Sequence, residues 1–317
     1  MGPQVQFKRG FIVYSDGNEK NVIVSPHSGP ALESSTSRDD NSETVASLCW
    51  GKIGGKLIIG NMPRHRLLGI DFNRDIPSLD LALKYYKHFI NRDLEKINYF
   101  KSRYGWVAID EKDYYNRLKI YQDFWAEVGK GQKIVLVHRA FTKMRNVPSI
   151  IDIVTFGKDG VKQDKIKGIV DEVNLKYYNF LKKIEDDYKQ AILFETKREL
   201  LNVIDKNGNI VNINSSLKKD LKKMELYCSK EKLIKLKNDF TPQNFLDCVQ
   251  DSLRNIPFPR ITIQKVFEGD LAYAPKRKLF PRKDKTIIEV EPCRFMNFWH
   301  PQITAEILYD VLKMLEN

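Results

Sequence analysis

The sequence predicts an α/β protein built as a three-layer α/β/α sandwich with a mixed, largely parallel central sheet. Three observations predict it. Short, almost continuous apolar runs such as KIVLV at Lys133–Val137 are typical of strands buried on both faces of a parallel sheet. Amphipathic stretches with helical spacing stand between these runs. The chain has 317 residues, 42% of them hydrophobic, which is ample for a large buried core.

The first predicted strands lead to a histidine. Residues 11–14 and 22–24 are predicted to form a hairpin, because the segment between them carries an Asp-Gly turn signal. Pro26 ends the second strand, so His27 is expected at the carboxyl end of a strand, where open α/β sheets bind their ligands. A neutral imidazole is the commonest metal ligand in proteins and a frequent general base.

A helix is predicted over residues 42–53. Its apolar residues recur at helical spacing, acidic residues stand at its start, and a glycine pair follows its end. Asp39, Asp40 and Glu43 are therefore expected at or near the helix N-terminus. The plain structural interpretation is that Asp40 or Ser42 caps this helix.

A basic segment follows the short strand predicted at residues 56–60. It includes Arg66 and precedes an apolar stretch, residues 67–70, which is predicted as another strand. Asn73 and Arg74 come where this stretch ends. Planar guanidinium groups beside an amide suit bidentate recognition of a carboxylate, so these side chains are expected to bind substrate.

Residues 79–104 and 114–128 are predicted as amphipathic helices, and they precede the buried strand Lys133–Val137. That strand ends in His138. Two strands of the same character thus each finish in a histidine, and the pair His27 and His138 is more informative than either residue alone. A further buried strand, IIDIVTFG, follows.

The middle of the chain has a different character. Residues 161–240 are lysine-rich amphipathic helices, interrupted by two alternating stretches around the hairpin signal Asn207-Gly208. We therefore expect residues 1–160 and 241–317 to form a catalytic α/β domain. Residues 161–240 are expected to form a helical insertion or subdomain with a short hairpin.

The C-terminal part returns to the α/β pattern. A helix is predicted at residues 241–254 and a strand at residues 261–267, before a basic loop, EGDLAYAPKRKLFPRKD. The final strand, TIIEVEPCRF, places Glu289 and Glu291 on one face by the two-residue period. Two buried carboxylates are costly without a cation, a proton or strong hydrogen bonds. His300 is expected to cap or pack the last helix.

Composition argues against several classes of protein. The net charge is +12, but the excess is dispersed along the chain and no nucleic-acid-binding motif accompanies it. The four cysteines form no CxxC pair, which argues against a thiolate zinc site or a redox motif. The absence of a membrane-spanning run and of an apolar signal core predicts a cytoplasmic protein without a membrane partner.

Six short motifs resemble those of the N-formylglutamate amidohydrolase family, which are zinc-dependent amide hydrolases related in fold to the zinc carboxypeptidases. In chain order they are SPHSG (25–29), RDDN (38–41), IDFNRD (70–75), VLVHRA (135–140), IDIVTFG (151–157) and EVEPCRFM (289–296). Arg139 stands where the family usually has Ser, and Glu289 where it often has Gln. The resemblance implies a phosphorylase/hydrolase-like sandwich and leaves residues 161–240 unmatched.

The resemblance also implies a metal site and a reaction. One zinc ion would be held by His27, Asp40 and His138, with the fourth position open to water. The loop after His27 fixes no geometry, so further acids stay open as metal ligands or bases: Asp39, Glu43, Glu33 and Glu289. Glu291 would carry the proton from water to the leaving nitrogen of an amide.

The implied substrate is an N-acyl amino acid, a small molecule that bears a carboxylate. Four side chains would bind it: Asn73, Arg74, Arg66 and Arg139. Two different functions stay open. A metallo-carboxypeptidase or a poly-γ-glutamate-type peptidase would use the same site on an acidic peptide, and a basic nucleic-acid-binding or scaffold protein would have no catalytic role. The sequence does not determine the oligomeric state.

Overall fold

The computed structural model describes residues 2–32, 38–156, 161–205, 213–267 and 285–316, together with Ile210 and Lys278. In this part of the chain, eight strands form one sheet with the order β1-β2-β4-β3-β5-β8-β6-β7. The strands are β1 (Gln4–Lys8), β2 (Phe11–Ser15), β3 (Asn21–Ser25), β4 (Lys56–Gly60), β5 (Lys133–Val137), β6 (Ser149–Val154), β7 (Arg260–Ile263) and β8 (Thr286–Pro292).

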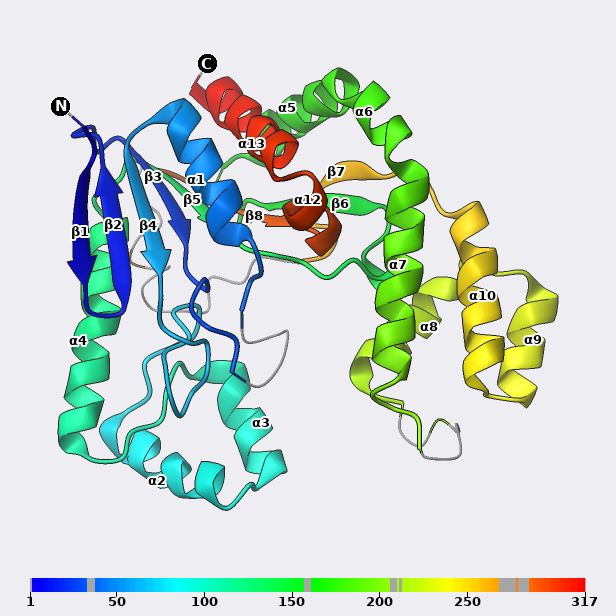
Figure 1. Cartoon of the computed structure of the whole chain (residues 1–317), viewed down its shortest axis with the longest axis horizontal. Helices are drawn as coiled ribbons and strands as arrows, with labels where there is room; N and C mark the ends of the chain where they lie inside the picture. Colours follow the sequence, from blue (N-terminus) through cyan, green and yellow to red (C-terminus); the bar gives the residue numbers. More distant parts are fainter. Residues whose placement is uncertain are drawn as a thin grey trace.

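Parallel pairing dominates the centre of the sheet. β4, β3, β5 and β8 are parallel neighbours, and β6 is antiparallel to β8 but parallel to β7. Helices α1 (Ser42–Ile53), α13 (Pro301–Glu316) and α5 (Gln163–Lys176) lie side by side over one face (Figure 1). Helix α4 (Glu111–Val128) packs on the other face. The predicted three-layer α/β/α sandwich is confirmed.

The central strands are buried on both faces, which explains their almost continuous apolar runs. Along β5, Val135 and Val137 pack in one core with α1, α5 and α13, whereas Ile134 and Leu136 pack in a second core with Phe124 of α4. Successive side chains of a strand point to opposite faces, so the two cores alternate along the same strand.

Three element predictions need correction. β2 and β3 do not form a hairpin, because β4 lies between them and pairs with both. The Asp16 carboxylate accepts a hydrogen bond from the Gly55 backbone N–H, at 2.8 Å, so the Asp-Gly turn leads the chain past the start of β4. Residues 67–70 form turns instead of a strand, because Arg117 of α4 donates to the carbonyls of Leu67 and Gly69.

The third correction concerns residues 79–104, which form two helices instead of one. α2 (Leu79–Ile90) and α3 (Leu94–Arg103) are separated at Arg92, whose backbone is in the left-handed region with a φ of 54°. Asp93 then caps α3 through its side chain, which accepts a hydrogen bond from the Lys96 backbone N–H.

The mainly helical residues 161–255 contribute one helix to a layer of the sandwich and also form a separate group of helices. The remaining helices are α6 (Tyr178–Lys183), α7 (Glu185–Leu200), α8 (Ser215–Met224), α9 (Lys230–Asn238), α10 (Pro242–Asn255), α12 (Arg294–Trp299) and the short 3-10 helix η1 (Met144–Asn146). α5, inside the predicted insertion, covers the sheet beside α13, whereas α7 to α10 stand to one side of it (Figure 1).

The structure also bears on several smaller predictions. Thr241 caps α10, as predicted, by accepting a hydrogen bond from the Asn244 N–H. Ile204 and Ile210 form an antiparallel bridge, as a hairpin requires, but Asn207-Gly208 and most of the basic loop at 268–284 lie outside the described residues. None of the described helices is long and apolar enough to cross a membrane.

Candidate metal centre

Two histidines and one aspartate meet at the carboxyl ends of the parallel strands. His27 follows β3, His138 follows β5, and Asp39 lies shortly before α1. Each offers a ligand atom, and these atoms lie within 4.8 Å of one another. The three side chains are buried, and Asp39 Oδ2 lies 3.1 Å from His27 Nδ1 and 2.8 Å from His138 Nδ1. We call these three residues the His–Asp–His cluster.

Backbone hydrogen bonds fix the parts of this cluster. The Asp39 N–H donates to the His27 carbonyl at 2.9 Å. This bond brings Asp39 next to His27, twelve positions earlier in the sequence. The β5–β8 register continues beyond β5, because the His138 N–H donates to the Val290 carbonyl and Ala140 pairs with Cys293. This register puts Glu291 alongside His138.

His27 is oriented by a second carboxylate. Its Nε2 lies 3.0 Å from Asp71 Oδ1, on the side of the ring away from Asp39. Asp71 is fully buried and also holds Arg64 at 3.0 Å and Arg66 at 2.8 Å. A carboxylate behind an imidazole fixes the tautomer and ring orientation of a metal ligand, so Asp71 prepares Nδ1 of His27 to face the cluster.

His138 has a corresponding polar neighbour. The Asn73 side-chain nitrogen lies 3.1 Å from His138 Nε2, while the Asn73 side-chain oxygen is buried without a hydrogen-bond partner among the described residues. Turning this amide by 180° places its oxygen where it accepts a hydrogen bond from the Nε2 N–H of His138. Nδ1 of that imidazole is then left with a lone pair that faces Asp39.

Electrostatics keep the cluster in forms that bind cations. Burial opposes ionisation of Asp39, but its hydrogen bonds with His138 and His27 hold its pKa well below the ordinary value. Burial lowers the pKa of His138, which favours the neutral imidazole. Two histidine imidazoles and a carboxylate are the donor set of many catalytic zinc sites, so these residues fit a divalent metal ion.

Glu291 has the opposite perturbation. Burial raises the pKa of this carboxyl well above the ordinary value, and the negative charges of Glu289 and Asp39 raise it further. Glu289 lies 3.9 Å from His138, so both predicted glutamates of β8 stand near the cluster. A carboxyl held in this way carries a proton at a pH where ordinary glutamates are ionised.

The third residue of the cluster is Asp39 and not Asp40, which corrects the expected ligand set. The Asp40 carboxylate lies 2.7 Å from Arg294 and 3.6 Å from Arg139, outside the cluster. Glu43, also a candidate ligand, pairs with Arg38 on the first turn of α1. Glu33 lies outside the described residues.

The predicted substrate-binding residues divide into two kinds. Arg66 lines the pocket, but its side chain is buried and donates to the carbonyls of Tyr104 and Lys101 in addition to its ion pair with Asp71. Its guanidinium therefore holds Asp71 and the surrounding backbone in place. Asn73, Arg74 and Arg139 also line the pocket described below. His300 packs edge-on against Phe180 and Phe295, as expected of a packing residue.

Sequence reasoning gave no role to Arg64 or Asp71. Arg64 lies 3.5 Å from Asp39 and 3.0 Å from Asp71, so it ties the two acids on either side of His27 together. Asp71 belongs to the IDFNRD motif, and that membership was the available signal. Arg64 stands in a basic run without any feature that distinguishes it from its neighbours.

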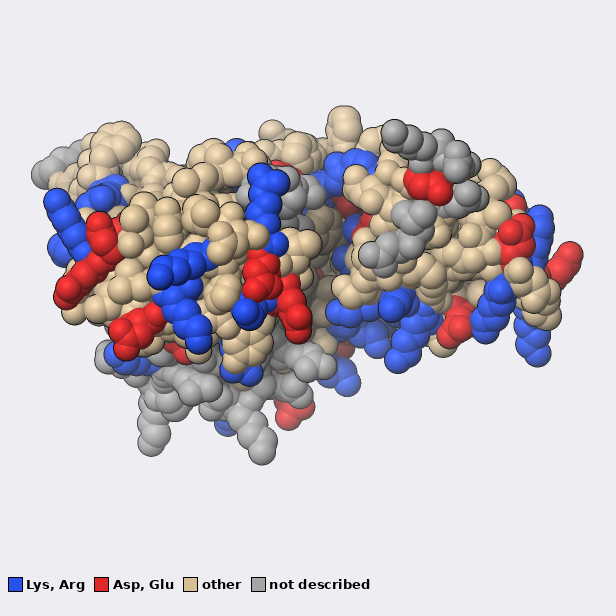
Figure 2. All heavy atoms as spheres, turned by 90° about the horizontal axis from the view of Figure 1, so that it is seen from below, with Lys and Arg blue, Asp and Glu red and all other residues tan. Residues whose placement is uncertain are grey.

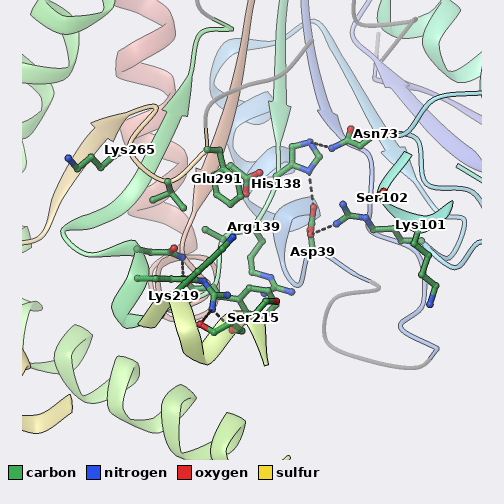
Figure 3. Close-up of a pocket in the computed structure, with 18 of the residues that line it drawn as sticks. Asp39, Asn73, Lys101, Ser102, His138, Arg139, Ser215, Lys219, Lys265 and Glu291 are labelled. Carbon is green, nitrogen blue, oxygen red and sulfur yellow. Dashed lines mark hydrogen bonds and ion pairs between the residues drawn. The ribbon is translucent and has the colours of Figure 1, made fainter. Parts of the chain in front are cut away.

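The cluster opens into a pocket of about 940 Å³ between the sheet and α8. Figure 3 shows Asp39, His138, Asn73 and Glu291 on one side of it, with Ser215 and Lys219 of α8 across from them. Among the described lining residues, ten are basic and three are acidic. The basic residues are Arg64, Arg66, Arg74, Lys101, Arg139, Arg145, Lys219, Lys222, Lys223 and Lys265.

Part of the positive charge of the chain therefore gathers at the pocket after folding, although the charge is dispersed in sequence. Figure 2 shows Lys and Arg side chains beside the hollow that separates the two bodies of the molecule. We call Lys219, Lys222, Lys223 and Lys265 the lysine wall. They stand on α8 and on the turn after β7.

Comparisons with known proteins add no relative. No protein-family model, curated protein or solved structure matches the chain. The resemblance to the N-formylglutamate amidohydrolase family therefore stays a prediction from short motifs.

Proposed function

We propose that this protein is a metal-dependent hydrolase, with zinc as the metal, that cleaves the amide bond of an N-acyl amino acid. The observation that carries the proposal is the buried His–Asp–His cluster beside Glu291, at the base of a large pocket. The donor set, its burial and its position at the carboxyl ends of parallel strands all support a catalytic metal site.

The chain's own residues supply binding, orientation and proton transfer. His27, Asp39 and His138 would hold the ion, and Asp71 and Asn73 would fix the two imidazoles. A bound divalent ion supplies Lewis acidity toward a carbonyl and toward water. Its positive charge would also counter the neighbouring carboxylates and so lower the pKa of Glu291.

Glu291 would then act as general base and general acid. It lines the pocket next to His138, where it would take a proton from the attacking water and give it to the leaving nitrogen. Arg74 and Asn73 line the same part of the pocket and would orient the substrate carboxylate. Arg139 also lines the pocket, with its guanidinium 4.4 Å from the centre of the Phe141 ring and its side chain almost fully buried.

The test is a comparison of neighbouring variants in metal content and hydrolysis. Zinc-reconstituted wild type, Asp39→Asn, Asp40→Asn and His138→Ala would be assayed with N-acyl amino acids and with γ-linked glutamyl peptides. We expect about one zinc ion per chain in wild type and Asp40→Asn, and a loss of zinc and activity in the remaining two. Equal, negligible zinc in all four proteins would refute the proposal.

The same assay separates the nearest rival function. A peptidase on this site would cleave the γ-linked peptides and leave single N-acyl amino acids intact. The volume of the pocket favours that possibility, because it lies at the upper end of the usual range for sites that bind small molecules.

A further inference from the structure

The lysine wall has no acidic partner among the described residues. Lys219, Lys222 and Lys223 lie within about one turn of α8, and Lys265 lies after β7. Within the ranges that the structure describes, no carboxylate forms an ion pair with any of the four. By contrast, Asp39 and Asp71 at the other end of the pocket are each held by histidine and arginine.

Buried contacts hold α8 in place. Asp220, between the wall lysines, accepts a hydrogen bond from the Arg145 backbone N–H at 2.8 Å and lies 3.6 Å from its guanidinium. Lys143 reaches Ser216 and Glu199 from the same segment. Arg145 belongs to η1, a few residues after His138, so the lysine wall is fixed relative to the strand that carries the cluster.

The turn that carries Lys265 is held by a different set of hydrogen bonds. Asp152 of β6 is fully buried, and its carboxylate accepts hydrogen bonds from the backbone N–H groups of Lys265, Val266 and Phe267. These three bonds, 2.8 to 3.0 Å long, fix the turn that lines the pocket. The exposed side chains of the lysine wall are therefore carried by two elements whose backbones are anchored.

Like charges face one another across this part of the pocket. Burial and the neighbouring positive charge of Lys265 lower the pKa of Lys223. An anion placed between two such cations gains charge-assisted hydrogen bonds and relieves their repulsion.

We propose that the lysine wall binds carboxylates on the acyl side of the substrate, so that the preferred substrate is an oligomeric acidic amide with negative charge on both sides of the scissile bond. The inference rests on the proposed function. Arg74 and Arg139 would hold the carboxylate next to the cleaved bond, while Lys219 and Lys223 would hold a carboxylate one or more units away.

The pocket suits carboxylates better than nucleic acid. Single strands are bound largely by stacking of bases on aromatic side chains. Only two aromatic residues, Phe141 and Phe267, appear among the described lining residues, and the Phe141 ring is covered by Arg139 and Lys143 at 4.4 and 4.9 Å. Lys223 of the lysine wall lies 5.9 Å from the centre of the Tyr227 ring, but that ring is not among the described lining residues, so the pocket offers charge with little surface for stacking.

The test uses a fluorescein-labelled γ-linked oligoglutamate as the probe. Its binding to zinc-loaded Glu291→Gln protein, which should not consume it, would be measured by fluorescence anisotropy. The Lys219→Met/Lys223→Met double substitution should weaken binding about tenfold and make binding less sensitive to added salt. Lys218→Met, on the same helix but outside the described pocket lining, should change binding less than about twofold.

A second arm measures hydrolysis with Glu291 intact. The double variant should raise KM for the oligoglutamate about tenfold and leave kcat/KM for a singly charged N-acyl amino acid within about twofold. Equal losses for both substrates, or none, would overturn the inference while leaving the hydrolase proposal standing. Lysine-dependent binding without hydrolysis of any amide would support the wall and overturn the hydrolase.

A competition arm addresses different anions. An unlabelled oligonucleotide with the same number of charges should compete at least about tenfold more weakly than unlabelled oligoglutamate. A tighter oligonucleotide would overturn the assignment to carboxylates. Circular dichroism of each variant would establish that the exposed substitutions leave the fold intact.

Discussion

The two ends of the pocket differ in how their charged side chains are paired. At one end, His27, Asp39, His138 and Glu291 are buried, and the carboxylates lie against imidazoles and guanidinium groups. At the other end, the lysine wall is largely exposed and has no acidic partner in the described structure. The first end could hold a cation between the ligand atoms of the His–Asp–His cluster. At the second end, the lysine ammonium groups are free of described carboxylates and could bind an anion from solution.

This contrast indicates where catalysis and selectivity should reside. Side chains at strand ends are set by backbone pairing, so changes there should alter the chemical step. Side chains on α8 are set by docking of one helix, so changes there should alter substrate binding. Substitutions at the two ends, and in the groups that anchor them, test this division.

The largest effect is expected at Glu291. Glu291→Gln removes the proposed proton carrier, so kcat should fall about a thousandfold while the zinc content stays near that of wild type. Steady-state kinetics together with metal analysis measure both quantities. A kcat within about tenfold of wild type would show that another group moves the proton.

The next effect is expected at Asp71, which lies behind His27. Asp71→Asn should weaken zinc binding by about 10- to 100-fold, because the substitution also leaves Arg64 and Arg66 buried beside a neutral amide. Competition with a chelator measures the affinity. Asp75→Asn is the matched control, since Asp75 lies in the same segment and its side chain accepts a hydrogen bond from the neighbouring Ile76 N–H. Equal affinities for the two variants would contradict this role of Asp71.

Asp220, which anchors α8 and with it three lysines of the lysine wall, predicts a pH dependence of the stability of the fold. Burial raises the pKa of Asp220 to about 6. The folded state therefore binds this proton more tightly than the unfolded state, so between pH ~4 and ~6 its contribution to the free energy of unfolding falls by roughly 1.4 kcal/mol per unit as pH rises.

Asp220→Asn should abolish that contribution. Urea unfolding of wild type and variant at several pH values between about 4.5 and about 6.5 measures the difference in slope. The stability difference between them should shift in favour of the variant as pH rises. A constant difference across this range would mean that Asp220 titrates at its ordinary pKa.

The smallest effect is expected at Thr241. Thr241→Ala removes the cap of α10 and should cost about 1 kcal/mol of stability. Because α10 stands outside the described pocket lining, KM and kcat should not change. A change in KM for charged substrates would mean that the body formed by α7 to α10 adjusts as a unit when the substrate binds.

Patterns confined to one segment were predicted well. The strand Lys133–Val137 has the predicted bounds, because its apolar run is buried on both faces and flanked by turn residues. His27 and His138 stand at the ends of parallel strands, so the rule that such ends converge was enough to bring them together.

Features that depend on contacts between distant segments were not predictable. Asp39 and Asp40 are adjacent and chemically identical, and the choice between them is made by Arg294, which holds Asp40 from 254 positions away. The lysine wall combines α8 with a turn after β7, and the docking of Asp220 on η1 and of the turn on Asp152 joins them. No periodicity in the sequence records either contact.

The unbroken pairing of β5 with β8 has a consequence for engineering. The peptide ladder from Lys133 to Ala140 sets how far Glu291 stands from His138, so that spacing does not depend on how well the layers above and below the sheet are filled. Shortening Val135 or Ile288 should lower the melting temperature and leave Glu291 and His138 in register. Thermostability and the proposed hydrolysis could then be tuned as separate traits in this protein.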